Sequence, residues 1–436
     1  MAYRDFSDAQ LSRRSLLRGS AYLSAAGALA QVPFSRALAY DGHAAMWPGV
    51  RSTVESYVAE GKVANMLASF GWGMGEPSAI AAGSLTLGGP TKVDLDSLYR
   101  IYSQTKPITG MCAMMLIEDG VLGLDQPVAD ILPAYANMMV QKEYDGAITE
   151  DNLEPAKRPI TIRQLMTHTA GLGYGIVQKG PIQKAYETKG LIPGQVSRIP
   201  LPGLGRGKPV KSLEAFADGL AEMPLVYQPG TKWSYSVGLD LLGRVIEVVE
   251  KKPFDQVLQE RLFDPCGMTS TFFKVPESEI ERFTTNYAIA AGIPLPIDPA
   301  ESSIYLETPA FPFGGAGLVS SARDYDRFLK MLLGYGKIDG KRVMSELAVR
   351  VGTSNILPEG ASLEGTWVSG QGFGAGGRAS DGAYGWGGAA GTAAFVSFKA
   401  GLRAQLYTQY MPSDSYPIQS GFPELVLKDL AAMQGA

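Results

Sequence analysis

The segment YRIYSQTKPITGMCAMMLIEDG, Tyr99 to Gly120, sets a serine three residues before a lysine, a spacing that no other lysine of the chain repeats. Ser103 and Lys106 stand at the start of an apolar run with helical spacing, and a glycine ends this run. Because residues i and i+3 of a helix share a face, a helix that starts here places the Ser103 hydroxyl beside the Lys106 amine. The free N–H groups of a helix start also favour developing negative charge.

This pattern has two interpretations. Ser103 could cap the helix while Lys106 is solvated, or the lysine amine could activate the serine hydroxyl, which is a weak nucleophile without a base. The chain has two histidines, His43 and His168, and it lacks a Gly-x-Ser-x-Gly elbow. A serine hydrolase of the α/β-hydrolase type, with histidine as the base, is therefore disfavoured. Because Pro107 and an apolar helix follow Lys106, its face is expected to be half-buried, which favours the reactive interpretation.

A second motif, PGTKWSYSVGLDLLG, places Tyr235 after a Pro-Gly turn and just before a predicted helix. A tyrosine close to a lysine cation can serve as a proton shuttle. The alternative is a buried core aromatic.

The third motif is YGWGGAAGTAAF, in which Gly387 and Gly388 let the backbone approach a ligand closely. The N–H of Ala389 is expected to be an oxyanion donor opposite that of Ser103. The alternative is a Gly-rich strand entry. GFGAGG, residues 372–377, formally matches a dinucleotide fingerprint, but no helix is predicted after it, which excludes that site.

The predicted elements place strands near both ends of the chain and helices in the middle. We therefore expect an α/β (α+β) fold, in which N- and C-terminal segments build one antiparallel sheet flanked by helices. A mostly helical domain is inserted between these segments. Two Gly/Pro-rich stretches, 171–209 and 355–388, are expected to be long loops that line a site.

Taken together, the three motifs resemble those of the serine β-lactamase and penicillin-recognising superfamily, in particular the class C β-lactamase-related carboxylesterases called family VIII esterases. The segments LMTHTAGL, YQPGTKWSYS, FDPCGMTSTFF and GGAGLVSSARDYDRFL are also similar to that family. The resemblance covers the chain from about Asp96 onward. It implies an α/β part formed by residues 40–130 and 310–436 and a mostly helical part formed by 131–309.

The resemblance also implies roles for individual residues. Ser103 matches the acyl-forming nucleophile, Lys106 its activator and Tyr235 the proton shuttle. Residues 386–388 occupy the place of the lactamases' Lys-Thr-Gly, and Ala389 follows as the implied backbone oxyanion donor. His168 lies in a motif that resembles a structural one, and we expect a satisfied core histidine there.

Two departures from the lactamase pattern bear on the substrate, and both affect expected substrate-binding positions. Val237 stands where lactamases have the Asn of Tyr-x-Asn, and it cannot hydrogen-bond a substrate amide. Trp386 replaces the cationic lysine that would anchor a substrate carboxylate. Both changes favour neutral carboxylic esters over β-lactams. An amidase, D-aminopeptidase, transacylase or weak β-lactamase on the same Ser-Lys-Tyr machinery stays open, and a non-catalytic cell-wall-binding module is the remote alternative.

The N-terminal residues 1–39 have the pattern of an export signal. Arg13 and Arg14 precede a weakly apolar stretch and a small-x-small sequence, Ala37 to Ala39, which resembles a twin-arginine signal. We expect the mature chain to begin near Tyr40 and to act in a periplasm or outside the cell. The apolar stretch is too short for a transmembrane helix, so stable membrane insertion is not expected.

The composition narrows the remaining functions. A net charge of −4 and the lack of a basic run make nucleic acid an improbable partner. With two histidines and two cysteines, Cys112 and Cys266, no metal site is expected, and no cofactor is implied. The cysteines are expected to be buried free thiols. A small ester is the expected partner, and the sequence does not indicate the oligomeric state.

Overall fold

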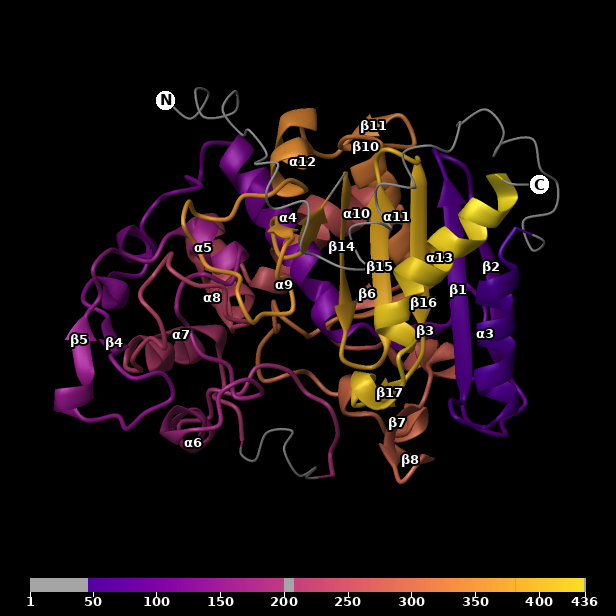
Figure 1. Ribbon diagram of the computed structural model, residues 1–436, viewed down its shortest axis with the longest axis horizontal. Coiled ribbons are helices and arrows are strands. Elements are labelled where there is room, and N and C mark those ends of the chain that lie inside the picture. The colour runs from indigo at the N-terminus through magenta and orange to yellow at the C-terminus, as the bar shows by residue number, and fades with distance from the viewer. Residues whose placement is uncertain (1–45, 200–207, 381, 435–436) are drawn as a thin grey trace.

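A seven-stranded sheet forms the centre of the computed structural model, which describes residues 46–199, 208–380 and 382–434 (Figure 1). Its strand order is β12-β13-β14-β15-β16-β1-β2, and all neighbours are antiparallel. Two strands come from the N-terminal part and five from the C-terminal part, which confirms the predicted fold class. The strands are β1 (Asn65–Trp72), β2 (Ser78–Gly83), β12 (Gly372–Phe373), β13 (Arg378–Ser380), β14 (Ala383–Gly388), β15 (Thr392–Ser397) and β16 (Leu402–Tyr407).

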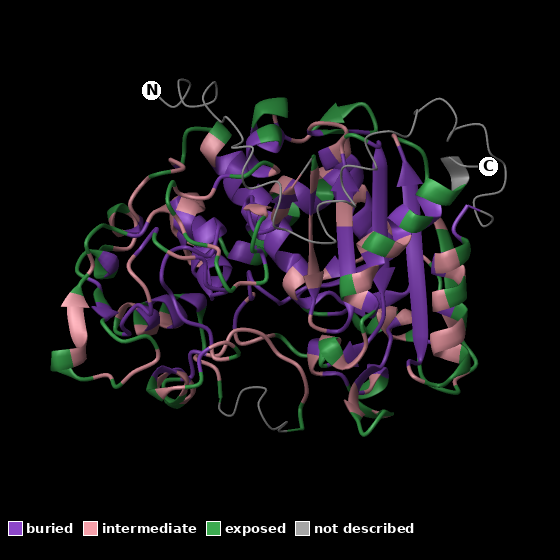
Figure 2. Cartoon of the chain, in the orientation of Figure 1, coloured by how far each residue is buried: buried purple, intermediate pink, exposed green. Residues whose placement is uncertain are grey.

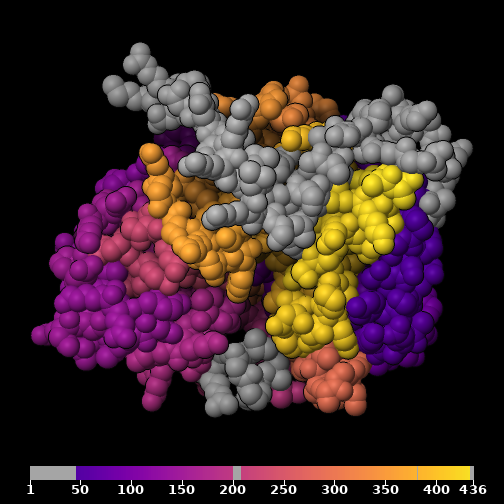
Figure 3. Space-filling model, in the orientation of Figure 1, coloured from indigo at the N-terminus to yellow at the C-terminus, as the bar shows by residue number. Residues whose placement is uncertain are grey.

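Helices cover both faces of this sheet. Every residue of β1 and of β16 is buried, as expected for strands covered on both sides (Figure 2). One face contacts α11 (Ala322–Leu333), which begins at the N-cap Ser321. The other contacts α3 (Pro48–Ala59) and α13 (Ile418–Gln434). In the space-filling view, the yellow C-terminal segment lies beside the indigo N-terminal one (Figure 3), so the two ends of the described chain pack together.

The helical part lies beside the sheet on the side of β14 (Figure 1). Its helix α5 begins with a capping box, in which Thr161 and Gln164 satisfy each other's backbone N–H groups. Ser212 caps α7 in the same part of the chain. The helices are α5 (Ile162–Met166), α6 (Pro181–Thr188), α7 (Leu213–Ala221), α8 (Gly238–Glu250), α9 (Phe254–Leu258) and α10 (Asp264–Cys266).

One long helix, α4 (Thr105–Glu118), joins the two parts. All twelve residues from Thr105 to Leu116 are buried, because α4 packs against α8 on one side and α12 (Glu346–Gly352) on another. Cys112 lies within this buried helix and Cys266 at the end of α10; both are buried free thiols, as the sequence predicted.

Among the described residues, two three-stranded sheets tie distant segments to this frame, whereas the two-stranded sheets β4-β5 and β10-β11 pair segments that are close in sequence. The order β3-β9-β6 places the strand before Ser103 at the edge of one three-stranded sheet, and β17-β7-β8 lies below the main sheet in Figure 1. Residues 271–298, which include β6, β7 and β8, thus pair with segments of the α/β part. The strands are β3 (Leu98–Arg100), β4 (Met139–Gln141), β5 (Leu153–Pro155), β6 (Thr271–Phe272), β7 (Asn286–Ala290), β8 (Ile293–Asp298), β9 (Val319–Ser321), β10 (Lys337–Ile338), β11 (Lys341–Arg342) and β17 (Tyr410–Met411).

The stretch 355–388 differs from its prediction as one long loop. It contains β12, β13 and β14, which complete the main sheet. β12 and β13 are two and three residues long, and three of the six residues of β14 are glycine, so the apolar alternation by which a strand is recognised in sequence is missing. The stretch 171–209 contains α6 and is otherwise irregular where the structure describes it. The predicted export signal, residues 1–39, lies outside the described residues.

Candidate active site

Ser103 lies in a single 3-10 turn, Tyr102–Gln104, that runs directly into α4. The preceding residue, Tyr102, has a φ of 41°, a left-handed conformation that is uncommon and costly for a bulky residue. Its surroundings hold it there, because Asn286 donates to the Tyr102 hydroxyl over 3.1 Å and Leu318 accepts the N–H of Ile101. The strained turn presents Ser103 at the first turn of the helix.

The structure brings the three predicted reactive side chains together. Lys106 Nζ donates to Ser103 Oγ over 3.2 Å, and the Tyr235 hydroxyl donates to the same oxygen over 2.7 Å. A serine oxygen held by two proton-transferring groups at hydrogen-bond distance has the geometry of an activated nucleophile. Lys106 is 0% exposed, so the interpretation of this residue as a solvated lysine is wrong.

The buried Lys106 amine is surrounded by polar and aromatic partners. It donates to the carbonyl of Gly315 over 2.6 Å and lies 4.6 Å from the centre of the Tyr235 ring. The Tyr174 ring is a second aromatic neighbour, at 5.8 Å. Ring faces attract an ammonium group, so these contacts partly replace the water that Lys106 loses on burial.

A buried carboxylate stands behind the Gly315 carbonyl. Asp240, in the first turn of α8, accepts the N–H of Gly315 over 2.9 Å. Burial raises the pKa of Asp240 to about 6, while the charge of Lys106 pulls it in the opposite direction. Asp240 thus holds Gly315, whose carbonyl oxygen accepts the hydrogen bond from Lys106. No local sequence motif indicated this role.

The third motif forms the opposite wall of the site, on β14. Trp386 Nε1 donates to the Tyr235 hydroxyl over 3.3 Å, which extends the hydrogen-bond chain that ends at Ser103. Gly388 packs so closely that a Cβ atom there would lie 2.2 Å from the carbonyl oxygen of Ile101. This close approach sets the end of β14, and with it Ala389, against the turn that carries Ser103.

Gln419 of α13 supports the end of β14 from behind. Its Nε2 donates to the carbonyl oxygens of Gly388 and Thr392, over 2.7 and 2.6 Å. A Cβ atom on Gly387 would lie 2.6 Å from the same nitrogen. The backbone contact at Gly388 requires glycine, and a Cβ atom on Gly387 would also lie 2.9 Å from the Thr392 carbonyl oxygen. No local motif indicates Gln419, which lies 31 residues after Gly388.

A cavity of about 760 Å³ opens at Ser103 and Tyr235. It is bounded by β14, β15, α13 and the side chains of Trp367 and Ile176, which are 61% and 54% exposed. Trp386, Gly387, Gly388 and Ala389, the residues of the third motif, all line it.

Val237 does not line this cavity, which corrects its expected place as a substrate-binding residue. Its side chain is 0% exposed, and the residue is the N-cap of α8. The turn before the helix directs Tyr235 toward Ser103 and Val237 into the core, so the residue two positions after the tyrosine does not reach the cavity.

His168 is buried, as expected, but it is only partly satisfied. Its Nδ1 contacts Ser236, whereas its Nε2 has no hydrogen-bond partner among the described residues. Burial lowers the pKa of His168 well below its ordinary value, and the charge of Lys106 lowers it further. The ring is therefore neutral near pH 7.

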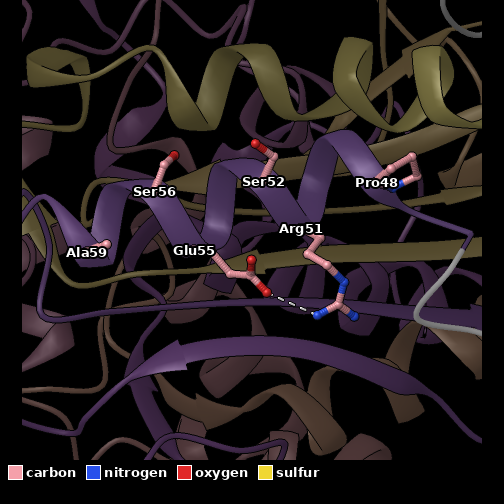
Figure 4. Close-up of a pocket in the computed structure, with 6 residues that line it drawn as sticks. All are labelled: Pro48, Arg51, Ser52, Glu55, Ser56 and Ala59. Carbon is pink, nitrogen blue, oxygen red and sulfur yellow. Dashed lines mark hydrogen bonds and ion pairs between the residues drawn. The ribbon is translucent and has the colours of Figure 1, made fainter.

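A second depression, of about 440 Å³, lies on the surface of α3 (Figure 4). Arg51 and Glu55 form an i,i+4 ion pair across it. It shares no lining residue with the cavity at Ser103. Across the described part of the chain, no group of three His, Cys, Asp or Glu side chains is placed to hold a metal ion. No helix there has the length and apolar character to cross a bilayer.

Comparison with known proteins agrees with this geometry. A family model described as Beta-lactamase matches residues 50–421. Protein Rv1367c of Mycobacterium tuberculosis is 37% identical over 264 residues, which are 61% of this chain and 61% of that protein. Esterase EstB of Burkholderia gladioli is 31% identical over 252 residues, 54% of this chain and 57% of that protein. The matches thus span less than two thirds of these curated relatives.

Among solved structures, the chain is similar to EstCE1, described as a hydrolase with promiscuous acyltransferase activity. The TM-score is 0.70 at 24% identity, and the likeness covers 88% of this chain and 98% of that chain. At this identity the likeness demonstrates a shared fold.

Proposed function

Because the chain belongs to the beta-lactamase family, we propose that it is a serine hydrolase that cleaves carboxylic esters through an acyl-enzyme on Ser103. One observation carries the proposal: Lys106 and Tyr235 both hydrogen-bond the Ser103 oxygen, inside a cavity large enough for a small ester.

In the acylation step, the Ser103 oxygen attacks the ester carbonyl while its proton passes to the Lys106 nitrogen, which acts as an uncharged amine and later returns the proton to Tyr235. The backbone N–H groups of Ser103 and Ala389 hold the developing oxyanion. The Tyr235 hydroxyl then delivers a proton to the departing alcohol, and the C–O bond of the ester breaks. Water repeats these steps on the acyl-enzyme, which releases the acid and restores Ser103.

Three observations support an ester rather than a β-lactam as the substrate. Trp386 stands where a lysine would anchor a carboxylate, and its indole N–H is directed to Tyr235. Trp367 and Ile176 add exposed apolar surface at the cavity. One relative with 31% identity is named an esterase.

Acyl transfer is the second candidate, because it differs from hydrolysis only in the acceptor of the acyl group. Promiscuous acyltransferase activity is part of the description of EstCE1, whose fold this chain shares. An alcohol acceptor added to an ester assay distinguishes the two reactions: a hydrolase releases acid at an unchanged rate, whereas a transferase diverts the acyl group into a new ester.

The test of the proposal is turnover of short-chain p-nitrophenyl esters by the wild type and by Ser103→Ala. We expect the substitution to lower kcat by at least about 10³-fold, because the acyl-enzyme can no longer form. A D-amino-acid amide and a cephalosporin, assayed in parallel, should be turned over more slowly than the esters. Undiminished ester turnover by Ser103→Ala would refute the proposal, and faster turnover of the amide or the cephalosporin would reassign the substrate class.

We also propose that the protein is exported through residues 1–39. The support is the Arg13–Arg14 pair and the small-x-small sequence that follows the apolar stretch. Residues 1–45 can be fused to a folded reporter in two forms, one with the natural sequence and one with Arg13 and Arg14 replaced by lysine. We expect the natural fusion to be exported and the double-lysine fusion to stay in the cytoplasm. Equal export of the two fusions would refute the twin-arginine route.

A further inference from the structure

His168 contacts the chain on both sides of Tyr235. Its carbonyl accepts the N–H of Ser234 over 2.9 Å, and its Nδ1 accepts the N–H of Ser236 over 3.2 Å. The Ser236 hydroxyl lies 3.0 Å from the same nitrogen. Between these two contacts, the His168 ring lies 4.7 Å from the Tyr235 ring, measured between centroids. One residue thus holds the neighbour before Tyr235, the neighbour after it and the tyrosine ring itself.

The contact at Nδ1 fixes the tautomer of the ring. A backbone N–H can only donate, so Nδ1 must present its lone pair to Ser236, and the proton of the neutral imidazole lies on Nε2. That Nε2–H is buried without a partner among the described residues. A buried unpaired donor is destabilising. The Nε2-protonated form of His168 therefore destabilises the fold through its unpaired donor. In return, its Nδ1 lone pair accepts the N–H of Ser236, next to Tyr235.

The backbone of His168 is also unusual, because its φ is 56°. Residues other than glycine rarely adopt this left-handed conformation, and asparagine, aspartate and histidine are the most frequent exceptions. This conformation lets the carbonyl and the side chain of one residue face the same turn. The strain and the orphaned Nε2–H thus occur together at the residue that holds Tyr235.

We propose that His168 is the positioning residue of Tyr235, and that its carbonyl and Nδ1 hold the Ser234–Ser236 turn so that the tyrosine hydroxyl stays on Ser103 Oγ. This inference rests on the proposed acyl-enzyme function. Residues 231–237 form no regular element other than a bridge at Lys232, so backbone pairing of a sheet or helix does not fix Tyr235. A displacement of about 1 Å in such a group can lower the rate about 10²-fold.

His168 acts through Tyr235 and not as a base of its own. Its side chain is 0% exposed and does not line the cavity, so it cannot touch a substrate. Its single lone pair is engaged by Ser236. The proton of Ser103 therefore passes to Lys106, as proposed above.

Two amide variants separate positioning from packing. Asparagine places an oxygen near the Nδ1 position and tolerates a positive φ, whereas glutamine carries its amide near the Nε2 position. We expect His168→Gln to lower the acylation rate about 10- to 100-fold, with KM changed less than about threefold. We expect His168→Asn to stay within about threefold of the wild-type rate. Ser236→Ala, which keeps the backbone N–H, should resemble His168→Asn.

The measurement is the rate at which a fluorophosphonate probe labels Ser103, followed by intact mass, together with kcat and KM for an ester. If the wild type is not labelled and does not turn over esters, the proposed function fails. If the wild type is labelled and His168→Gln is labelled at the same rate, only the present inference is overturned. Equal losses in His168→Gln and His168→Asn would also overturn it, since packing would then explain the effect.

A measurement on the unaltered protein guards against a variant that does not fold. With two histidines in the chain, the ¹⁵N shifts of His168 can be assigned against His168→Asn. We expect a protonated Nε2 and an unprotonated Nδ1 at pH 7. A protonated Nδ1 would contradict the contact with the Ser236 N–H and with it the proposal.

Discussion

Trp386 donates its indole N–H to a hydroxyl that in turn donates to Ser103. A donor aimed at the Tyr235 oxygen stabilises that oxygen when the hydroxyl proton moves away, so we expect the Trp386 N–H to assist proton transfer by Tyr235. Trp367 contacts the same tyrosine through its ring, at 5.2 Å, without such a bond. Substitutions of the two tryptophans therefore compare the effect of losing a hydrogen bond to Tyr235 with the effect of changing a ring contact to it.

Replacing Trp386 by phenylalanine keeps the ring and removes the donor. We expect kcat/KM for a short-chain ester to fall about 3- to 10-fold, which corresponds to a loss of roughly 1 kcal/mol. Trp367→Phe is the matched control and should change it less than about twofold. Equal effects of the two substitutions would show that the Trp386 N–H does not act on Tyr235.

Asp240 makes stability depend on pH in an unusual direction. Its pKa is raised to about 6 by burial, against an unfolded value near 3.8. Between about pH 4 and pH 6 the folded chain keeps a proton that the unfolded chain has lost, so the contribution of Asp240 to the free energy of unfolding falls as pH rises. A shift of about two units corresponds to about 2–3 kcal/mol.

Asp240→Asn removes this titration and keeps the oxygen that accepts the Gly315 N–H. We expect the stability of the variant relative to the wild type to rise by about 2–3 kcal/mol from pH 4 to pH 7, measured by urea unfolding. His168 does not obscure the result, because it titrates equally in both proteins. A difference that stays constant across this range would contradict the raised pKa.

At the scale of elements, the site depends on how closely β14 approaches the turn at Ser103. The carbonyl of Ile101 would lie 2.2 Å from a Cβ atom on Gly388, a distance that no side chain tolerates. Glycine at this position is thus required for the close approach of the end of β14, and with it Ala389, to the turn that carries Ser103.

Gly388→Ala should separate β14 from the turn. We expect kcat/KM to fall at least about 100-fold, since the proposed oxyanion donors would lose their alignment. Gly421→Ala serves as the control, because nothing lies within 4 Å of a Cβ atom there. It lies within α13, so it should keep full activity and gain about 0.5–1 kcal/mol of stability. Full activity of Gly388→Ala in the same assay would contradict the account of this wall.

Elements with clear periodicity were predictable from sequence and the glycine-rich ones were not. The helix after Ser103 has apolar residues at helical spacing and a glycine at its end, and it forms as α4. The strands β12 to β14 lack that signal, because β12 and β13 are two and three residues long and glycines occupy three of the six positions of β14. Ser103, Lys106 and Tyr235 were found through local motifs. Asp240 and Gln419 were missed because their partners are far away in sequence.

At the scale of the whole molecule, one buried ion pair connects the strand before Ser103 to the small sheet that contains β8. Arg100 donates to Asp298 from Nε over 2.7 Å, and the two side chains are 0% and 1% exposed. The same guanidinium donates to the Thr284 carbonyl and the Ser303 hydroxyl, so its hydrogen-bonding capacity is well used. Arg100, three residues before Ser103, thus contacts Thr284, Asp298 and Ser303, which lie 184 to 203 residues later in the chain.

Arg100→Met leaves Asp298 buried without its counter-charge. We expect a loss of about 3–5 kcal/mol in the free energy of unfolding, and the double variant Arg100→Met/Asp298→Asn should recover part of it. Arg323→Met is the control, since its ion pair with Asp96 is half-exposed and should contribute less than about 1 kcal/mol. Equal losses in the two single variants would contradict a buried, structural role for the Arg100 pair.

The central claim is that Ser103 carries the acyl group. Its most direct test is peptide mapping by mass spectrometry after the protein is quenched in acid during turnover of a slowly hydrolysed ester. The account predicts one acyl group per chain, on the peptide that contains Ser103, and no adduct in Ser103→Ala. An adduct on any other serine, or steady turnover without any adduct under conditions where deacylation is slow, would contradict it.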